Sequence, residues 1–160
     1  MFRLNKLTDY AIVVMQYVAS RPEVPLHTTR ELTVATKLPS STVSKILKEL
    51  QDHGLLTSQR GMKGGYSLAR PPSMISVAEI IEALEGSMGF TECATAPGYC
   101  ELEGNCRVQS NSYVIGRALQ QTLGSITLAD LTTPLQIGKT RTSNRRSALT
   151  SITSGTGRIR

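Results

Sequence analysis

Apolar residues recur at helical spacing in the first third of the chain. One side of segment 5–20 is apolar, which predicts a first helix with the stripe Leu7, Ala11, Val14, Tyr17 and Val18. Thr28 and Glu31 have the spacing of a capping box, which predicts a short second helix ending near residue 36. Ser40 or Ser41 can cap a third helix. The buried stripe of that helix is predicted to be Val43, Ile46, Leu47 and Leu50.

Two short runs with strand character follow, at residues 55–59 and 66–69. Between them, the stretch from Arg60 to Gly65 contains three glycines, which permit the positive φ angles of a tight hairpin. The order helix, helix, helix, strand, turn, strand is typical of a winged helix-turn-helix. The sequence therefore predicts a mainly α fold with a two-stranded wing.

The second half of the chain predicts further helices around a cysteine-containing loop. Ser76 and Glu79 repeat the capping-box spacing, so a helix should start there and run to about residue 85. A long helix is expected over 108–123, and Thr127 can cap one last turn. One face of the long helix is predicted to carry Val108, Ile115, Ala118, Leu119 and Leu123.

Charge is distributed unevenly along the chain. Segment 1–70 contains ten Lys or Arg and five Asp or Glu, whereas segment 71–135 contains two and seven. Segment 136–160 contains six basic residues and no acid; it is rich in Ser, Thr, Gly and Arg, and such a composition predicts a disordered tail. We therefore expect a basic head that binds a polyanion, an acidic segment with the loop and helices, and a basic tail. Ordinary surface charge is the alternative explanation.

Other classes of protein fit the sequence poorly. The apolar run from Tyr10 to Ala19 loosely resembles a signal peptide, but Asp9 precedes it, Gln16 interrupts it, and it is too short to span a bilayer. We expect a cytoplasmic protein without a membrane partner. Neither a nucleophile–base pair nor a P-loop is recognisable, so no enzyme and no small-molecule substrate are expected. The two histidines, His27 and His53, are expected on turns or the surface.

A helix-turn-helix places the N-terminal part of its third helix in the major groove of DNA. Small hydroxyl side chains permit close approach there, and lysines neutralise phosphates. At the wing tip, Arg60 could enter a minor groove. The predicted DNA-binding residues are Ser41, Thr42, Ser44, Lys45, Lys48, Arg60, Lys63 and Gly64. The alternative is a three-helix module that packs against another protein.

Three cysteines, Cys93, Cys100 and Cys106, lie within fourteen residues, and the chain has no others. An odd number of thiols cannot all form disulfides within one chain, and the paired clips of structural zinc sites are missing. The longer spacing suits an iron–sulfur cluster. Three unrelated free cysteines, a zinc- or thiol-based redox repressor without iron, and an iron–sulfur carrier remain alternatives. A fourth ligand is not obvious.

Several motifs carry a resemblance to a known family. They are Leu7-Thr8-Asp9-Tyr10-Ala11, the stretch 39–50, Arg60 to Leu68, Ile75 to Ile81, the three cysteines, and Ile126 to Leu131. In this order they resemble the winged-helix iron–sulfur transcription regulators that include IscR, NsrR and the SUF-operon regulator, the last being the most similar branch. The resemblance covers about residues 1–135.

The resemblance implies a homodimer with the 108–123 helix as its seam, a pseudo-palindromic double-stranded DNA operator, and repression of iron–sulfur assembly or stress genes. It implies an iron–sulfur cluster on the three cysteines, 2Fe–2S being favoured and 4Fe–4S possible. One branch has a histidine where Gln109 stands here, and Gln109 is a poor iron ligand. The nitric-oxide-sensing branch uses an aspartate that matches Asp9, which implies Asp9 as the fourth ligand. Asp9 could equally be a first-turn carboxylate that stabilises its helix.

Overall fold

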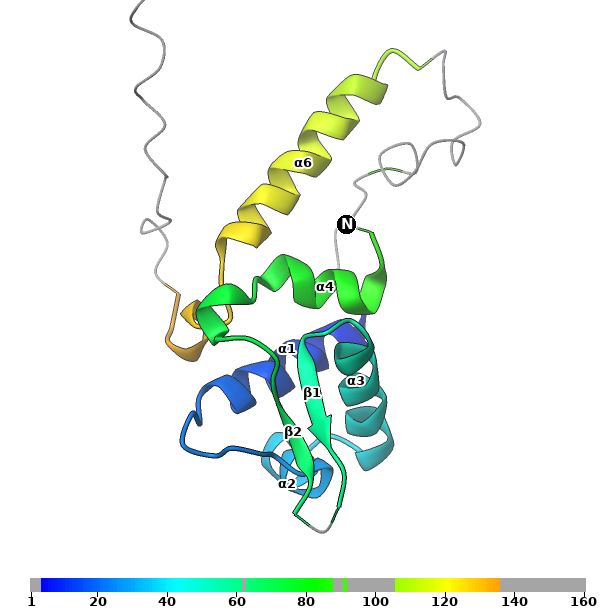
Figure 1. The fold of residues 1–160 in the computed structure, drawn as a ribbon. Helices are drawn as coiled ribbons and strands as arrows, with labels where there is room; N and C mark the ends of the chain where they lie inside the picture. The colour runs from blue at the N-terminus through cyan, green and yellow to red at the C-terminus, as the bar shows by residue number, and fades with distance from the viewer. Residues whose placement is uncertain (1–3, 62, 88–90, 92–105, 136–160) are drawn as a thin grey trace, which may run out of the picture.

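A computed structural model describes residues 4–61, 63–87, 91 and 106–135 (Figure 1). In chain order the elements are α1 (Lys6–Ala19), α2 (Thr29–Thr36), α3 (Ser40–Asp52), β1 (Leu56–Gln59), β2 (Gly65–Leu68), the 3-10 turn η1 (Pro72–Met74), α4 (Val77–Glu85), α6 (Gln109–Ser125) and the 3-10 turn η2 (Asp130–Thr132). This order confirms the predicted winged helix-turn-helix and its mainly α class. Cys93, Cys100 and the tail 136–160 lie outside the described residues.

The helices α2 and α4 begin at their predicted caps, Thr28 and Ser76, whereas α1 begins at a cap that was not predicted and α3 lacks its predicted serine cap. The Asn5 side chain caps α1 by accepting from the backbone N–H groups of Leu7 (2.8 Å) and Thr8 (3.0 Å). The Ser76 side chain caps α4 as expected. The prediction that Ser40 or Ser41 caps α3 is wrong, because Pro39 occupies the cap position and makes no side-chain hydrogen bond. Because Pro39 takes the cap position, Ser40 and Ser41 lie in the first turn of the helix and cannot act as its cap.

One hydrophobic core joins both predicted segments of the chain. Met15 of α1, Leu47 of α3 and Ile80 of α4 are fully buried in it. Leu128, which follows α6, is also fully buried in this core, and its N–H donates to the carbonyl of Ile75 at 2.7 Å. The division at residue 70 therefore does not separate two cores, and the assignment of separate roles to the two segments stays a prediction.

The α6 helix extends away from the rest of the molecule beyond α4 (Figure 1). Within it Ser112 alone is buried. Its N-terminal and middle apolar side chains are exposed, with 64% of Val114, 44% of Ile115 and 37% of Leu119 accessible. Among the described residues, no helix combines the length and apolar character needed to cross a bilayer.

The start of α4 contains a complete capping box. The Ser76 hydroxyl accepts from the Glu79 N–H at 3.2 Å, and the Glu79 carboxylate accepts from the Ser76 N–H at 2.8 Å. Arg70 donates to the other carboxylate oxygen at 2.8 Å. Burial by itself raises the pKa of Glu79, but the hydrogen bonds from Ser76 and the Arg70 charge outweigh it, so that the pKa lies below its ordinary value.

We expect this carboxylate to make folding pH-dependent. Because the folded pKa lies below the unfolded one, the stabilisation is complete above the unfolded value, near 4.5, and is lost as pH falls through the folded value. Its size should be under about 1 kcal/mol, since the Glu79 side chain is 37% exposed. Urea unfolding of the wild type and of Glu79→Gln should show a stability difference at neutral pH that shrinks in acid. A difference that is constant with pH would contradict this assignment.

Candidate nucleic-acid interface

The α3 helix has one buried and one exposed side. Val43, Ile46, Leu47 and Leu50 are fully buried, as predicted from their spacing. The opposite side forms an exposed row that we name the recognition face: Ser41, Ser44, Lys45 and Lys48. Thr42 lies half-buried at its edge. Packing of the apolar stripe against the core thus forces two hydroxyls and two cations outward along a single helix face.

The wing consists of β1, β2 and the turn between them. The strands are antiparallel, with Leu56 opposite Leu68 and Gln59 opposite Gly65. A hydrogen bond of 2.9 Å joins the hydroxyls of Thr57 and Ser67 across the strands. At the tip, Arg60 and Lys63 are exposed, so two cations project from a short, paired hairpin.

Two glycines of the wing are required by close backbone approach. A Cβ on Gly64 would lie 2.3 Å from the Gln59 carbonyl oxygen, and a Cβ on Gly65 would lie 2.8 Å from the His27 carbonyl oxygen. Gly64 also donates its N–H to the Gly61 carbonyl at 3.0 Å, which closes the turn. Gly64, predicted as a DNA-binding residue, therefore has a clear role in shaping the tip that carries Arg60 and Lys63.

The wing tip and the N-terminal end of α3 lie at the same end of the molecule, whereas α6 lies at the other (Figure 1). Lys37, in the turn between α2 and α3, adds an exposed cation that sequence reasoning missed. It has φ 57° and ends α2 in the left-handed conformation. Glycine or asparagine is the usual residue at such a position, so a lysine there carries no signal of the left-handed conformation. This end of the molecule can bind phosphates through several cations at once.

The two histidines differ in position. His53 is exposed at the end of α3, as expected. His27 is only 1% exposed, so its expected place on a turn or the surface is wrong. Its backbone pairs with Tyr66 of the wing, which draws the side chain inward. The residue spacing around His27 contains no sign of this pairing.

Of the predicted cluster ligands, Cys106 and Asp9 are described. Cys106 is a half-buried free thiol shortly before α6, and Asp9 is exposed in the first turn of α1. Within the described ranges, no three His, Cys, Asp or Glu side chains are grouped closely enough to hold a metal ion. Since Cys93 and Cys100 lie outside those ranges, the set of ligands stays a prediction.

A polar contact joins the first turn of α1 to the end of α4. The fully buried Thr8 donates its hydroxyl to Glu85 Oε1 at 2.6 Å, and the Asn5 N–H donates to the same oxygen at 2.9 Å. Asp9 follows Thr8, and Glu85 precedes the segment that contains the cysteines. The contact therefore holds the helix of the predicted fourth ligand beside the start of the cysteine-containing segment.

A winged helix-turn-helix with an exposed cationic recognition face defines the class of DNA-binding transcription regulators. The pattern of the Rrf2 family, described as an iron-dependent transcriptional regulator, matches residues 4–134. The chain belongs to the Rrf2 family, whose members are regulators and not enzymes.

Solved structures of similar fold agree with this membership. IscR of T. potens is 27% identical, with a TM-score of 0.61 over 81% of this chain and 85% of that one. CymR of Staphylococcus aureus is 25% identical, with a TM-score of 0.60 over 82% of this chain and 99% of that one. CymR of B. subtilis, a global cysteine regulator, has a TM-score of 0.66 at 24% identity, over 82% and 97% of the two chains.

Proposed function

We propose that this regulator senses the state of an iron–sulfur cluster and represses genes for cluster assembly or stress response. The observation that carries the proposal is the placing of all three cysteines between α4 and α6, in a chain that belongs to a family described as iron-dependent. The 27% identity with T. potens IscR supports it. Similarity of motifs favours the SUF-operon regulator branch within that family.

The donor chemistry fits such a group. Thiolates are the ligands that iron–sulfur clusters prefer, and three of them occur together here. Cys93, Cys100 and Cys106 would hold the cluster, 2Fe–2S being favoured over 4Fe–4S, with Asp9 as the fourth ligand. A bound cluster would supply bonds between the loop and the neighbouring helices. The Glu85 contact with Thr8 and Asn5 supports this, because it keeps the Asp9 helix next to the start of the loop.

We also propose that α6 is the seam of a homodimer. Val108, Ile115 and Leu119 recur at intervals of seven and four residues, and all three are exposed in the single chain. An exposed apolar helix face of this kind is typical of an association surface. A second copy of α6 is the partner whose chemistry matches it, and a symmetric dimer would suit a pseudo-palindromic operator.

We expect Leu119→Asp to shift the protein from dimer to monomer, because a carboxylate would be buried at the seam. Sedimentation equilibrium should give the variant a dimer dissociation constant at least about tenfold higher than that of the wild type. Ser110→Asp is the matched control, since Ser110 is exposed about two and a half turns away on the opposite side of α6. If the two variants have the same dimer dissociation constant, Leu119 has no special role in the dimer, and the seam lies elsewhere.

Regulation requires that the loop with a bound cluster and the loop without one favour different separations of the two recognition faces in the dimer. In helix-turn-helix dimers these faces lie about one turn of DNA apart. The α4 helix is suited to transmit this difference. Its Glu82 accepts from Gln120 of α6 at 2.8 Å, while its Glu85 accepts from Thr8 of α1. The α4 helix thus contacts both α6, which carries the proposed seam, and α1, which carries Asp9.

The proposal is tested by an anaerobic absorption spectrum of the full chain, with iron and sulfide quantified in the same sample. Charge-transfer bands with matching iron and sulfide would support the cluster. A chain that stays colourless and iron-free after reconstitution would overturn it. Selection of duplexes from a random pool by loaded and unloaded protein then identifies the operator and shows which form binds it.

A thiol- or zinc-based regulator without iron is the second candidate. The 25% identity with S. aureus CymR favours it, since the B. subtilis protein of that name is a global cysteine regulator. Zinc bound in a colourless protein purified without air, together with thiol-dependent DNA affinity, would decide for this candidate.

A further inference from the structure

Three parts of the DNA-binding head meet at His27. The backbone of His27 pairs with Tyr66 of β2 in both directions, through N–H···O=C bonds of 2.8 and 2.9 Å. Immediately afterwards Thr28 caps α2, so His27 is the link between the wing and the first helix of the helix-turn-helix. Any displacement of His27 would therefore move β2 relative to α2 and to α3, which packs on α2.

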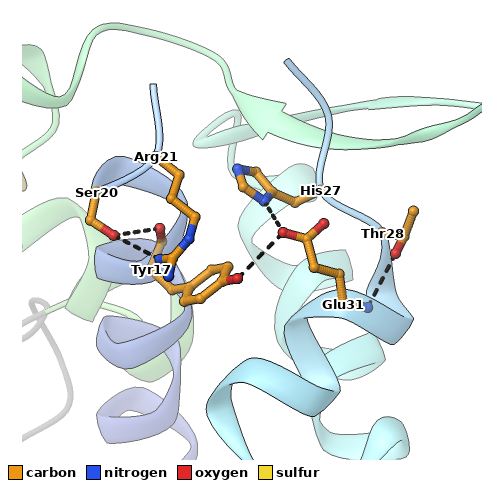
Figure 2. A network of polar contacts seen from close by, with 6 residues as sticks. All are labelled: Tyr17, Ser20, Arg21, His27, Thr28 and Glu31. Atoms are coloured by element: carbon orange, nitrogen blue, oxygen red, sulfur yellow. Dashed lines mark hydrogen bonds and ion pairs between the residues drawn. The ribbon is translucent and has the colours of Figure 1, made fainter. Parts of the chain in front are cut away.

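The His27 side chain is fixed by a single polar contact among the described residues. Its Nδ1 lies 2.8 Å from Glu31 Oε1, as Figure 2 shows. Because an ionised carboxylate only accepts, Nδ1 carries the hydrogen and donates it. Nε2 is buried and has no hydrogen-bond partner in the described part of the chain. The ring is thus anchored to α2 at one nitrogen and would have no polar anchor without Glu31.

The same carboxylate also contacts α1. The Tyr17 hydroxyl lies 3.5 Å from Glu31 Oε1, and the Tyr17 ring stands edge-on to the His27 ring at 5.8 Å between centroids. Arg21 covers the Tyr17 ring at 3.8 Å (Figure 2). Glu31 is in capping-box position, yet its carboxylate binds His27 while Thr28 makes the cap. The backbone N–H of Glu31 therefore serves the cap, while its carboxylate contacts His27 and Tyr17.

We propose that His27 and Glu31 form a latch that sets the position of the wing relative to the recognition face, and that Glu31 is thereby a positioning residue for DNA binding. The proposal rests on the proposed contact of the wing with the duplex. Glu31 itself would not touch DNA. It acts through the His27 ring, whose backbone holds β2 and hence the cations at the tip.

A double-mutant cycle tests the latch. Glu31→Ala and Arg60→Ala, alone and together, are assayed in the full chain against a duplex selected from a random pool by the wild type. Arg60→Ala should lower affinity about tenfold, as expected for loss of a groove contact. Glu31→Ala should lower the affinity about fivefold in the wild-type background and less than about twofold in the Arg60→Ala background. The second effect is smaller because a wing without Arg60 gains little DNA affinity from correct placement.

Two further variants separate positioning from general damage. Glu31→Gln keeps an oxygen that accepts from Nδ1 and should restore affinity to within about twofold of the wild type. Glu23→Ala removes the same charge from an exposed site in the loop before His27 and should not lower affinity. Equal losses from Glu31→Ala in both backgrounds would overturn the latch while leaving the wing contact intact. No loss from Arg60→Ala would overturn the wing contact, and the latch with it.

Discussion

Lys45→Glu should reduce DNA affinity about a hundredfold per chain at physiological salt, since it removes one phosphate contact and adds a repulsive charge. Lys45 lies at the centre of the recognition face, exposed between Ser44 and Lys48, while its neighbour Ile46 is fully buried. The plot of log affinity against log salt concentration should also become shallower by about two units. Fluorescence anisotropy over a salt series measures both changes.

Lys6→Glu is the matched control for this variant. Lys6 is exposed at the start of α1, which lies away from the wing tip (Figure 1). The same change of charge there should alter affinity by less than about threefold when both proteins are compared at equal iron content. Equal losses from the two variants would mean that binding follows net charge alone. No loss from Lys45→Glu would favour a module that packs against protein.

Cys106→Ala should reduce bound iron to less than about a tenth of the wild-type content, because loss of even an outer-shell partner weakens metal sites tenfold or more and a ligand contributes more. Sulfide and the charge-transfer absorption should fall together with iron. The fold should be retained, since Cys106 is only half-buried and lies outside the hydrophobic core. Anaerobic iron and sulfide assays with far-ultraviolet circular dichroism check both statements.

Gln109→Ala provides the comparison in the same region. Gln109 begins α6 three residues after Cys106, at the place where one branch of the similar regulators has a histidine. If Gln109 is not a ligand, this variant should keep its iron. Retention of iron and sulfide by Cys106→Ala would remove that cysteine from the proposed site, and loss by both variants would point to damage of the segment as a whole.

The elements from α1 to α4 could be predicted because local chemistry and tertiary packing agree there. The stripe of Val43, Ile46, Leu47 and Leu50 is buried as its spacing indicates. Ser76 and Glu79 form the capping box that their spacing predicts. The glycines at 64 and 65 are needed at the hairpin, where side chains would collide with backbone. The capping box and the contact of Gly64 with Gln59 join residues close in sequence, whereas Gly65 is needed because the distant His27 lies against it.

Predictions failed where partners lie far apart in sequence. His27 is buried because Tyr66 pairs with it, and a distance of that length along the chain leaves no periodic pattern. The spacing of Thr28 and Glu31 predicts a reciprocal cap, but the Glu31 carboxylate bonds to His27 instead, and the place of His27 depends on its pairing with the distant Tyr66. The spacing of the cysteines indicates three thiolate ligands for a cluster, but it does not indicate which residue is the fourth ligand. For that reason Asp9 rests on a resemblance and not on geometry.

The burial of Leu128 has a consequence for the order of events during synthesis. The core of the head includes Val14, Leu47 and Leu128, so it is incomplete until residues beyond 128 have left the ribosome. All three cysteines precede Leu128 in the chain and have been made by then. A nascent chain therefore exposes its thiols before its DNA-binding head can close, and a fragment that stops short of residue 128 would lack part of its own core.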